Sequence, residues 1–410
     1  MSTLMSVEEA IAGILSRIGT VDTETISITE AVGRVLAEDV ISDTNLPPFD
    51  NSAMDGFAIR AEDSGNNITL NVVMDIPAGV NPSETLEAGQ AARIMTGAPI
   101  PQGANAVIPV EDTDADFSSL DDASLPEQVT LGRVVEQGAA IRRLGENIHE
   151  GQTILTAGTV ITPAGIGMLA SLGKAKLTVL RRPRVAIIGS GDELVDVDET
   201  PELGQIRDSN SYALSALIEQ DGAIPLRQPI APDDADAIRE MFKNTLEQHP
   251  DLIVSSAGVS VGAADYIRAI LDELGEIGFW KINLRPGKPL AFGEIATIPF
   301  FGLPGNPVSA MVTYLVLVRP ALMTLAGKPH HPRMIRAKTA EAMRSDGRRT
   351  FARVTLTQDE GAWVASETGT QSSGAHLSMV LADGLLVIPE GVTAVDVGTE
   401  LDVLLLNQSL

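Results

Sequence analysis

Acidic side chains of this chain gather in short loops that each follow a predicted strand. The loops span residues 190–194, 231–234, 257–265 and 303–307, and the candidate ligands among the acids of the first three are Asp192, Glu193, Asp233 and Asp265. If the strands run parallel, these loops share the carboxyl edge of one sheet, where open α/β sheets bind ligands. Carboxylate oxygens there can hold Mg²⁺, with water and a substrate phosphate completing its shell. The pattern favours a metal and phosphate site at this edge.

Basic residues lie close to these acids in the sequence. The segment 281-KINLRPGKPLAFG-293 supplies Lys281, Arg285 and Lys288. Such bases can neutralise a phosphate or another oxyanion and stabilise charge that develops during its transfer. Neither a Ser-His-Asp set nor a lysine nucleophile is suggested, so metal-assisted chemistry on a phosphorylated ligand is the reaction class that fits. The alternative is structural: the acids cap helices, as expected of Asp233, and the bases pair with surface acids.

The loop 303–307 has a second property that suits an anion. Gly305 lies in a tight turn, Asn306 is a good N-cap, and Pro307 fits the first turn of a helix. Free backbone N–H groups at a helix N-terminus attract anions. Ser309 adds a hydroxyl donor on the first turn. An ordinary βα turn that binds nothing is the alternative.

Hydrophobic periodicity gives the elements that must position these groups. From Arg184 onward, strands are expected at 184–189, 223–230, 251–256, 279–284 and 290–293, with helices between several of them. This alternation predicts a mostly parallel sheet with helices on both faces. The apolar run 308–326 is expected to be a buried helix, bent at Arg319-Pro320. A small all-β domain, expected to be a barrel, follows Pro329.

The first half of the chain contains two expected helices and a β-rich segment. A capping box at Ser6 and Glu9 predicts a first helix, and a second is expected over 28–37. Between 69 and 141, short β-type runs alternate with turn residues, which is typical of a small β-rich domain. The densest basic spot of this half, 141-IRRLGENI-148, makes Arg142 a credible anion contact, and a solvated arginine pair is the alternative.

Composition restricts the possible functions. The chain has 410 residues, 55 acidic against 29 basic side chains, a net charge of −26 and no cysteine. Two to four domains are expected from this length. The negative charge argues against nucleic-acid or anionic-membrane partners. Without cysteine there are no disulfides or thiolate metal sites, which suits a cytoplasmic protein. Signal-peptide features are not visible at the N-terminus, and no membrane span is expected.

Eight motifs together resemble the molybdopterin molybdenumtransferases, the MoeA family, which includes the E domain of gephyrin. They are FDNSAMDGFA (49–58), RIMTGAPIP (93–101), IRRLGENI (141–148), SGDEL (190–194), APDD (231–234), SSAGVSVGAADY (255–266), FWKINLRPGKPLAFG (279–293) and GLPGNPVSA (302–310). The motifs follow the family's order, and the resemblance covers essentially the whole chain.

The resemblance implies a multi-domain α/β plus β fold. A helical N-terminal domain, with some β structure, would comprise 1–44 and 148–178, interrupted by an inserted β-rich domain at 45–147. The parallel-sheet α/β molybdopterin-binding domain would span 179–328, and a C-terminal β-barrel would span 329–410. Members are homodimers with a shared active cleft, and contact with molybdopterin adenylyltransferase and molybdoenzymes is possible. The implied reaction converts adenylylated molybdopterin and molybdate into molybdenum cofactor and AMP, with Mg²⁺.

The resemblance also implies a role for individual residues. The residues implied to be catalytic are Asp55, Thr96, Arg142, Glu193, Asp233 and Asp265, and the last three would be the metal ligands. The residues implied to bind substrate or oxyanion are Asp192, Lys281, Arg285, Lys288, Gly305, Asn306, Ser309, Arg353 and Ser373.

The chain departs from the family pattern at a few positions. Asn147 stands where many relatives have Asp, Arg285 where many have Lys, Ala257 where Gly is frequent, and Asp383 where Asn is usual. Arg285 keeps the charge and adds a bidentate fork that suits an oxyanion. Two alternative functions follow from the same features: molybdopterin adenylyltransferase, which shares the α/β fold, and a scaffold or binding module like gephyrin. The long N-terminal region disfavours the first, and the intact set of loop acids and bases disfavours the second.

Overall fold

A computed structural model describes residues 4–117, 125–256, 273 and 275–406. The chain divides into two compact units. Unit 1 comprises 1–37, 160–162 and 176–410, and unit 2 comprises 38–159 and 163–175. The four-domain division expected from the resemblance stays a prediction.

A six-stranded sheet forms the centre of unit 1. Its strand order is β15 (Ile224–Arg227), β12 (Arg184–Ile188), β16 (Leu252–Ser255), β20 (Ile298–Gly302), β19 (Pro289–Ile295) and β17 (Gly275–Lys281). The first four strands are parallel to one another, while β19 and β17 are antiparallel. The predicted mostly parallel sheet is therefore confirmed, with an antiparallel hairpin at one side. The basic segment 281–288 follows β17 in this hairpin.

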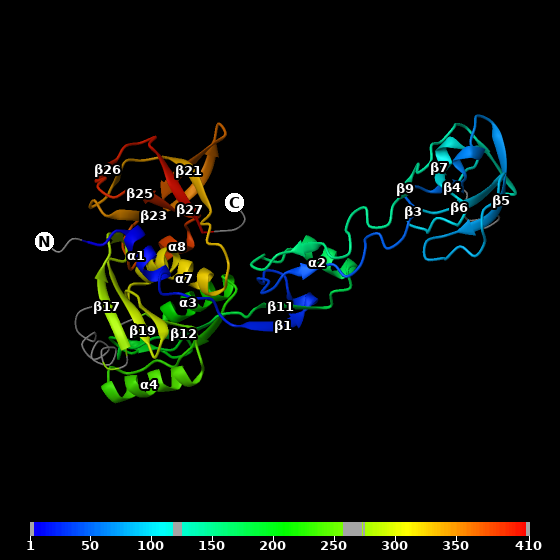
Figure 1. The fold of residues 1–410 in the computed structure, drawn as a ribbon. Helices are drawn as coiled ribbons and strands as arrows, with labels where there is room; N and C mark the ends of the chain where they lie inside the picture. Colours follow the sequence, from blue (N-terminus) through cyan, green and yellow to red (C-terminus); the bar gives the residue numbers. More distant parts are fainter. Residues whose placement is uncertain (1–3, 118–124, 257–272, 274, 407–410) are drawn as a thin grey trace. The chain divides into compact units, whose positions relative to one another are not determined.

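Helices cover both faces of the sheet (Figure 1). On one face, α4 (Ala235–Glu247) packs on apolar side chains such as Ala186, Ile188 and Phe300. On the other, α1 (Val7–Leu15), α3 (Ser209–Gln220) and the helical segment after β20 pack on Val185, Ile187 and others. Adjacent residues of β12 thus serve opposite faces, because strand side chains alternate. The strand is buried from Val185 to Ile188, as expected for a parallel sheet covered on both sides.

The apolar segment after β20 is one buried helical stretch. It consists of α6 (Pro307–Thr313), a π-helical turn η4 (Tyr314–Val318) and α7 (Arg319–Leu325). By length and composition it is the one helix in the described residues that could cross a membrane, and 78% of its most apolar window is buried. A helix that is apolar all round is expected in a protein core. The predicted buried helix is confirmed, and its irregular turn lies just before Arg319-Pro320.

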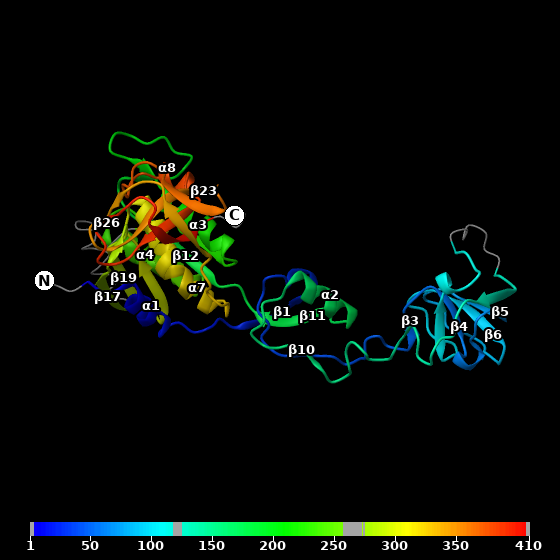
Figure 2. The same ribbon diagram turned by 90° about the horizontal axis from the view of Figure 1, so that it is seen from above.

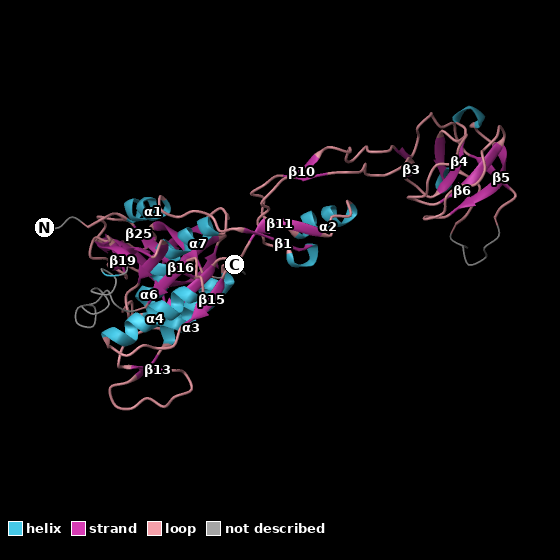
Figure 3. Ribbon diagram, turned by 60° about the horizontal axis from the view of Figure 1, so that its bottom comes forward, coloured by secondary structure: helices cyan, strands magenta, loops and turns pink. Residues whose placement is uncertain are grey.

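The C-terminal part of unit 1 is a closed β-barrel, as predicted. Strand β23 (Arg349–Asp359) pairs with both β24 (Ala362–Glu367) and β25 (Gly384–Ile388), and β21 (Met334–Thr339) and β27 (Glu400–Leu405) complete the ring. The short strand β18 (Leu284–Arg285) runs beside β23. It joins the basic segment to the barrel. A short helix, α8 (Leu377–Val380), lies between β24 and β25. The pairs β13–β14 (Leu194–Val195, Ile206–Arg207) and β22–β26 (Met343–Arg344, Ala394–Val395) are separate; the loop at β13 is visible in Figure 3.

Unit 2 is β-rich. Its five-stranded sheet has the order β7 (Ala106–Pro109), β4 (Gly56–Ile59), β6 (Gln90–Ile94), β5 (Ile68–Ile76) and β8 (Gln128–Leu131), and β4, β5 and β6 are seen in Figure 2. Two smaller pairs are β3–β9 (Asn51–Ser52, Ile141–Arg142) and β2–β10 (Val40–Ile41, Thr153–Leu155). The unit also holds α2 (Pro163–Ser171). The predicted β-rich segment is confirmed.

The helical description of the first domain is not supported. Only Ile28–Glu30 of the second expected helix is helical, as a 3-10 turn. Val35 and Leu36 instead form β-bridges to Val160 and Val179. In the segments assigned to this domain, strands β1 (Thr23–Ser27), β2, β10 and β11 (Lys176–Leu180) accompany the two helices. Backbone pairing with residues more than 100 positions away overrode the local helical pattern.

Candidate functional site

The strand-end loops of unit 1 meet at one sheet edge because β12, β15, β16 and β20 are parallel. Backbone bonds tie them together: Ser190 bridges Ala231, and the Leu303 N–H donates to the Ser255 carbonyl at 2.7 Å. The Ser256 N–H donates to Ile188 O at 3.0 Å. The predicted grouping is therefore confirmed for the loops 190–194, 231–234 and 303–307. The remaining loop, residues 257–265 with Asp265, lies outside the described residues.

Asp192 and Asp233 belong to neighbouring loops of this edge. Asp192 is exposed, and its Oδ1 accepts the Asp233 N–H at 3.0 Å. The Oδ1 of half-buried Asp233 and the Oγ of Ser190 are both buried and lack a hydrogen-bond partner within the described part of the chain. A buried polar atom without a partner is costly unless a ligand or cation satisfies it. The helix cap expected of Asp233 is made by Asp234, which accepts two N–H groups of α4.

Glu193 is exposed, and its carboxylate lies directly against Gly191. Gly191 has φ +145°, and a β-carbon there would collide with the Glu193 carboxyl group. Only glycine therefore permits this carboxylate position. Among the described residues, no group of three or more His, Asp or Glu side chains could hold a metal ion. Glu193 and Asp233 are the two described members of the predicted metal set.

The turn after β20 is held from two sides. Asn210 of α3 donates its Nδ2 hydrogen to the Gly305 carbonyl at 2.7 Å, and the Val308 N–H donates to the Ser373 carbonyl at 3.2 Å. Asn306 is the N-cap, as predicted, and Ser309 is buried. The expectation that the first N–H groups of α6 are free for an anion is wrong for Val308, because a loop of the barrel uses that donor.

The basic segment turns sharply between Arg285 and Lys288. Lys281 and Lys288 are exposed, whereas Arg285 is half-buried. Gly287 has φ +111°, and a β-carbon there would meet the Thr313 hydroxyl, so this close approach requires glycine. The charge of Arg285 reaches the barrel, where it helps to lower the pKa of Asp346 behind the larger effect of Arg348. Arg285 thus links the basic segment electrostatically to the barrel.

Arg353 is buried, with 1% of its surface exposed. Its Nε donates to Ser378 Oγ at 3.1 Å, and its Nη2 donates to the carbonyls of Ser372 at 3.0 Å and Thr370 at 3.4 Å. Burial lowers the pKa of Arg353, the neighbouring Glu367 opposes this, and Arg285 adds to it. The guanidinium therefore orders the loop that carries Ser373. Its predicted contact with an oxyanion is not tested.

Asp55 and Thr96 lie together in unit 2. The Asp55 Oδ1 accepts the Thr96 N–H at 2.6 Å and its hydroxyl at 2.7 Å. These bonds, the backbone one first, lower the pKa of Asp55, so it is ionised at neutral pH. Arg142 is exposed on β9 and pairs in register with Asn51 of β3, which also bridges Pro99.

Several residues of the site were not identified from sequence. Ser190 and Asn51 each have a buried side-chain oxygen without a partner in the described parts of the chain. Ser190 lies in the motif SGDEL and Asn51 in the motif FDNSAMDGFA. The motifs could therefore have pointed to these residues, but the sequence does not show that their side-chain oxygens are buried. The contact of Asn210 with the Gly305 carbonyl joins segments 95 residues apart, so no signal in the sequence pointed to it. Ser378 gave no signal, because its contact with Arg353 depends on the barrel.

Comparison with known proteins agrees with this geometry. Family models described as "MoeA N-terminal region (domain I and II)", "Probable molybdopterin binding domain" and "MoeA C-terminal region (domain IV)" match residues 5–173, 186–324 and 336–406. Molybdopterin molybdenumtransferase 2 of Mycobacterium tuberculosis is 39% identical over 395 residues, covering 92% of this chain and 94% of its own. Molybdopterin molybdenumtransferase of Haemophilus influenzae is 36% identical over 374 residues, covering 90% of each chain.

Solved structures give the same result. The crystal structure of the molybdopterin biosynthesis MoeA protein from Pyrococcus horikosii has a TM-score of 0.83 and 31% identity, covering 98% of this chain and 99% of the other. Fold and site define a multi-domain protein with a mostly parallel sheet, polar strand-end loops along one edge of that sheet and a closed C-terminal barrel. The chain belongs to the MoeA family, the family of the molybdopterin molybdenumtransferases.

Proposed function

We propose that this protein is an enzyme of molybdenum cofactor biosynthesis that inserts molybdate into adenylylated molybdopterin and releases AMP. The observation that carries the proposal lies at the sheet edge formed by the loops 190–194, 231–234 and 303–307, which we name the ligand edge. There, Asp233 Oδ1 and Ser190 Oγ are buried without partners among the described residues. This edge lies within the segment matched by the molybdopterin-binding family model. Molybdate is an oxyanion, and the pterin supplies the thiolates, so a chain without cysteine can perform the insertion.

Two described carboxylates at this edge, Glu193 and Asp233, offer the oxygen ligands that Mg²⁺ prefers. The donors are oxygens, and the unpartnered Asp233 Oδ1 is the kind of atom a cation satisfies. Mg²⁺ commonly uses one or two carboxylates together with substrate phosphates and water. Glu193 and Asp233 would hold it, with Asp265 as the third ligand proposed from the motif. When bound, the ion would neutralise phosphate charge as the P–O bond to AMP breaks.

The chain's own residues would orient the substrates. Lys281, Arg285 and Lys288 would bind phosphate or molybdate oxygens, and Asp192 would keep the Asp233 loop in place through its bond to the Asp233 N–H. The other proposed substrate contacts are Gly305, Asn306, Ser309, Arg353 and Ser373. Asp55, which is ionised, Thr96 and Arg142 would act from the β-rich unit.

The reaction is tested with the full-length protein, adenylylated molybdopterin, molybdate and Mg²⁺. We expect molybdate-dependent AMP release, and its absence would refute the proposal. Asp233→Asn should lower the rate about 100-fold or more, because a charged group at the reacting phosphate is lost. Asp236→Asn, an exposed aspartate on α4, is the matched control and should react normally. Transfer of AMP from ATP to molybdopterin without molybdate would instead indicate an adenylyltransferase.

We further propose a cytoplasmic homodimer with a shared cleft, open to transient contact with molybdopterin adenylyltransferase and with molybdoenzymes. Two inactive variants, Asp55→Ala and Asp233→Ala, separate a shared cleft from a cleft within one chain. If the cleft is shared, a heterodimer of the two variants has one intact site of two. Subunit exchange in an equimolar mixture makes about half of the dimers heterodimers, so about a quarter of wild-type activity should return. A cleft within one chain regains none, and that result would contradict the proposal.

A further inference from the structure

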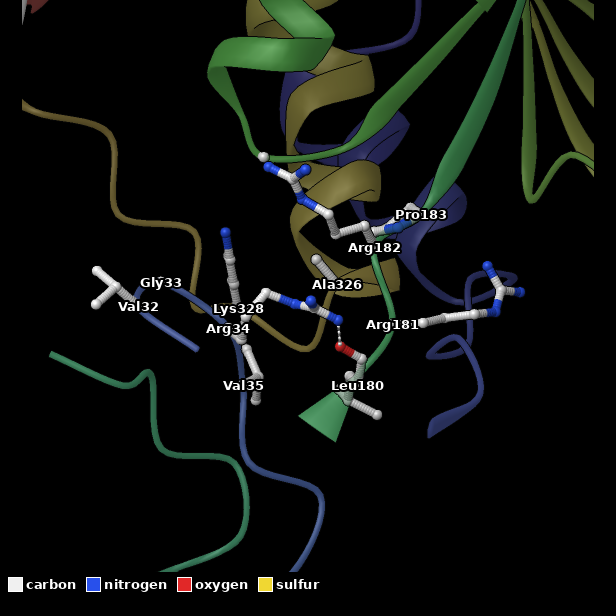
Figure 4. A pocket seen from close by; sticks show the side chains of 11 residues that line it. Val32, Gly33, Arg34, Val35, Leu180, Arg181, Arg182, Pro183, Ala326 and Lys328 are labelled. Atoms are coloured by element: carbon white, nitrogen blue, oxygen red, sulfur yellow. Dashed lines mark hydrogen bonds between the residues drawn. The ribbon is translucent and has the colours of Figure 1, made fainter. Parts of the chain in front are cut away.

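A second group of basic side chains in unit 1 lies away from the ligand edge. Arg34, Arg181, Arg182 and Lys328 line one cavity of about 160 Å³, which we name the cationic pocket (Figure 4). Clustering of cations stands out in a chain with a net charge of −26. The pocket shares no residue with the predicted molybdopterin site.

Two of these arginines already have partners. Arg181 binds the Asp251 carboxylate with both Nη atoms, at 2.6 and 2.5 Å, and it points away from Lys328 in Figure 4. Arg34 pairs with Glu24 and donates to the Leu180 carbonyl at 2.8 Å. Their charges are therefore largely balanced, and they form the wall of the pocket.

The other two cations have no such balance. Within the described residues, neither Lys328 Nζ nor the Arg182 guanidinium has a carboxylate within 4.0 Å. The acid whose charge reaches Lys328 is Asp221, which is occupied by the Tyr314 hydroxyl at 2.8 Å and by Arg319 Nε at 2.9 Å. Burial, followed by the neighbouring Arg182, lowers the pKa of Lys328. Two cations held side by side at a cavity favour an anion.

A purely structural role explains only part of this arrangement. Lys328 Nζ lies against Gly222, just after the C-terminus of α3, and a β-carbon on Gly222 would be 2.9 Å from it. Helix C-termini attract cations, so Lys328 has a reason to reach this point. That attraction does not explain why Arg182 faces the same cavity, or why the space beside them is hollow.

We propose that the cationic pocket binds a small phosphate-type oxyanion, held by Lys328 and Arg182 and flanked by Arg34. An adjoining cavity of about 590 Å³ shares Arg34, Arg181 and Arg182 and adds Arg184, and Glu24 and Glu30 also line it, Glu24 as the partner of Arg34. The two cavities together have room for more than a single phosphate, so the ligand class we propose is a diphosphate. Charged hydrogen bonds from a lysine and an arginine suit its oxygens.

Calorimetric titration of the full-length protein with pyrophosphate at low ionic strength tests the proposal. We expect binding that weakens as salt is added and that exceeds the binding of inorganic phosphate. Lys328→Met and Arg182→Gln should each raise Kd at least tenfold, about 1.4 kcal/mol. The matched control is Lys243→Met, which removes the same charge from an exposed position on α4.

A further variant separates this pocket from the ligand edge. Lys288→Met lies in the predicted molybdopterin site, so it should leave the pyrophosphate binding that depends on Lys328 intact. Absence of binding in the wild type, an unchanged Kd in Lys328→Met, or equal weakening in Lys243→Met would overturn the proposal. Thermal melting shows whether each variant folds. If Lys328→Met does not fold, the Kd of Arg182→Gln decides the test, because Arg182 is exposed.

Discussion

Replacing Arg353 by methionine should release the barrel loop that carries Ser373. The guanidinium donates to Ser378 Oγ at 3.1 Å, to Ser372 O at 3.0 Å and, more weakly, to Thr370 O at 3.4 Å. Charged hydrogen bonds contribute about 1.5–3 kcal/mol each, so the two shorter bonds give about 3–6 kcal/mol. The substitution also removes the cost of burying the guanidinium charge, which offsets part of the lost hydrogen-bond energy. The expected net loss of local stability is therefore about 2–4 kcal/mol.

Amide hydrogen exchange by mass spectrometry measures this loss directly. A loss of about 2–4 kcal/mol in local stability makes the backbone amides of residues 368–379 exchange about 30- to 700-fold faster. It should extend to the Val308 amide, because that N–H donates to the Ser373 carbonyl. Arg336→Met is the control on the barrel surface. Its ion pairs with Glu400 and Asp402 are more than half exposed, so a change under about 0.5 kcal/mol is expected. Unchanged protection in Arg353→Met would refute the reasoning.

Two further changes test the site in each unit. Thr96→Val should raise the pKa of Asp55 in a carboxyl NMR titration, because a donor to the ionised form is lost. The lowered pKa of Asp55 stabilises the fold above the unfolded-state pKa, and this contribution disappears as pH falls through the folded value. Gly287→Ala should cost about 1–3 kcal/mol in thermal unfolding, because of its positive φ and the adjacent Thr313 hydroxyl. Gly19→Ala, where a β-carbon meets nothing, should stay within about 0.5 kcal/mol; equal effects at both glycines would contradict this reasoning.

Local signals predicted many elements correctly. The capping box at Ser6 and the Asn306-Pro307 pair each mark an observed helix start. Strand periodicity located most of the α/β sheet and the barrel. These features depend on residues near one another in sequence, so they can be read without the fold.

Features that depend on distant partners could not be predicted. Residues 28–37 have a helical pattern, but Val35 and Leu36 pair with Val160 and Val179. The Val308 N–H looked free at a helix start, yet its acceptor is Ser373, 65 residues later. In both cases the deciding hydrogen bond joins segments that only the folded chain brings together.

The neighbouring acids Asp233 and Asp234 show how far residue type alone can carry a site prediction. Both follow the same strand, and the sequence made Asp233 a candidate for either helix cap or metal ligand. The fold divides these tasks: Asp234 accepts the N–H groups of α4, while the Asp233 Oδ1 is buried without a described partner. Because Asp234 satisfies the helix, Asp233 has no structural use for that oxygen. The capping by Asp234 is thus the physical reason to propose the ligand role for Asp233.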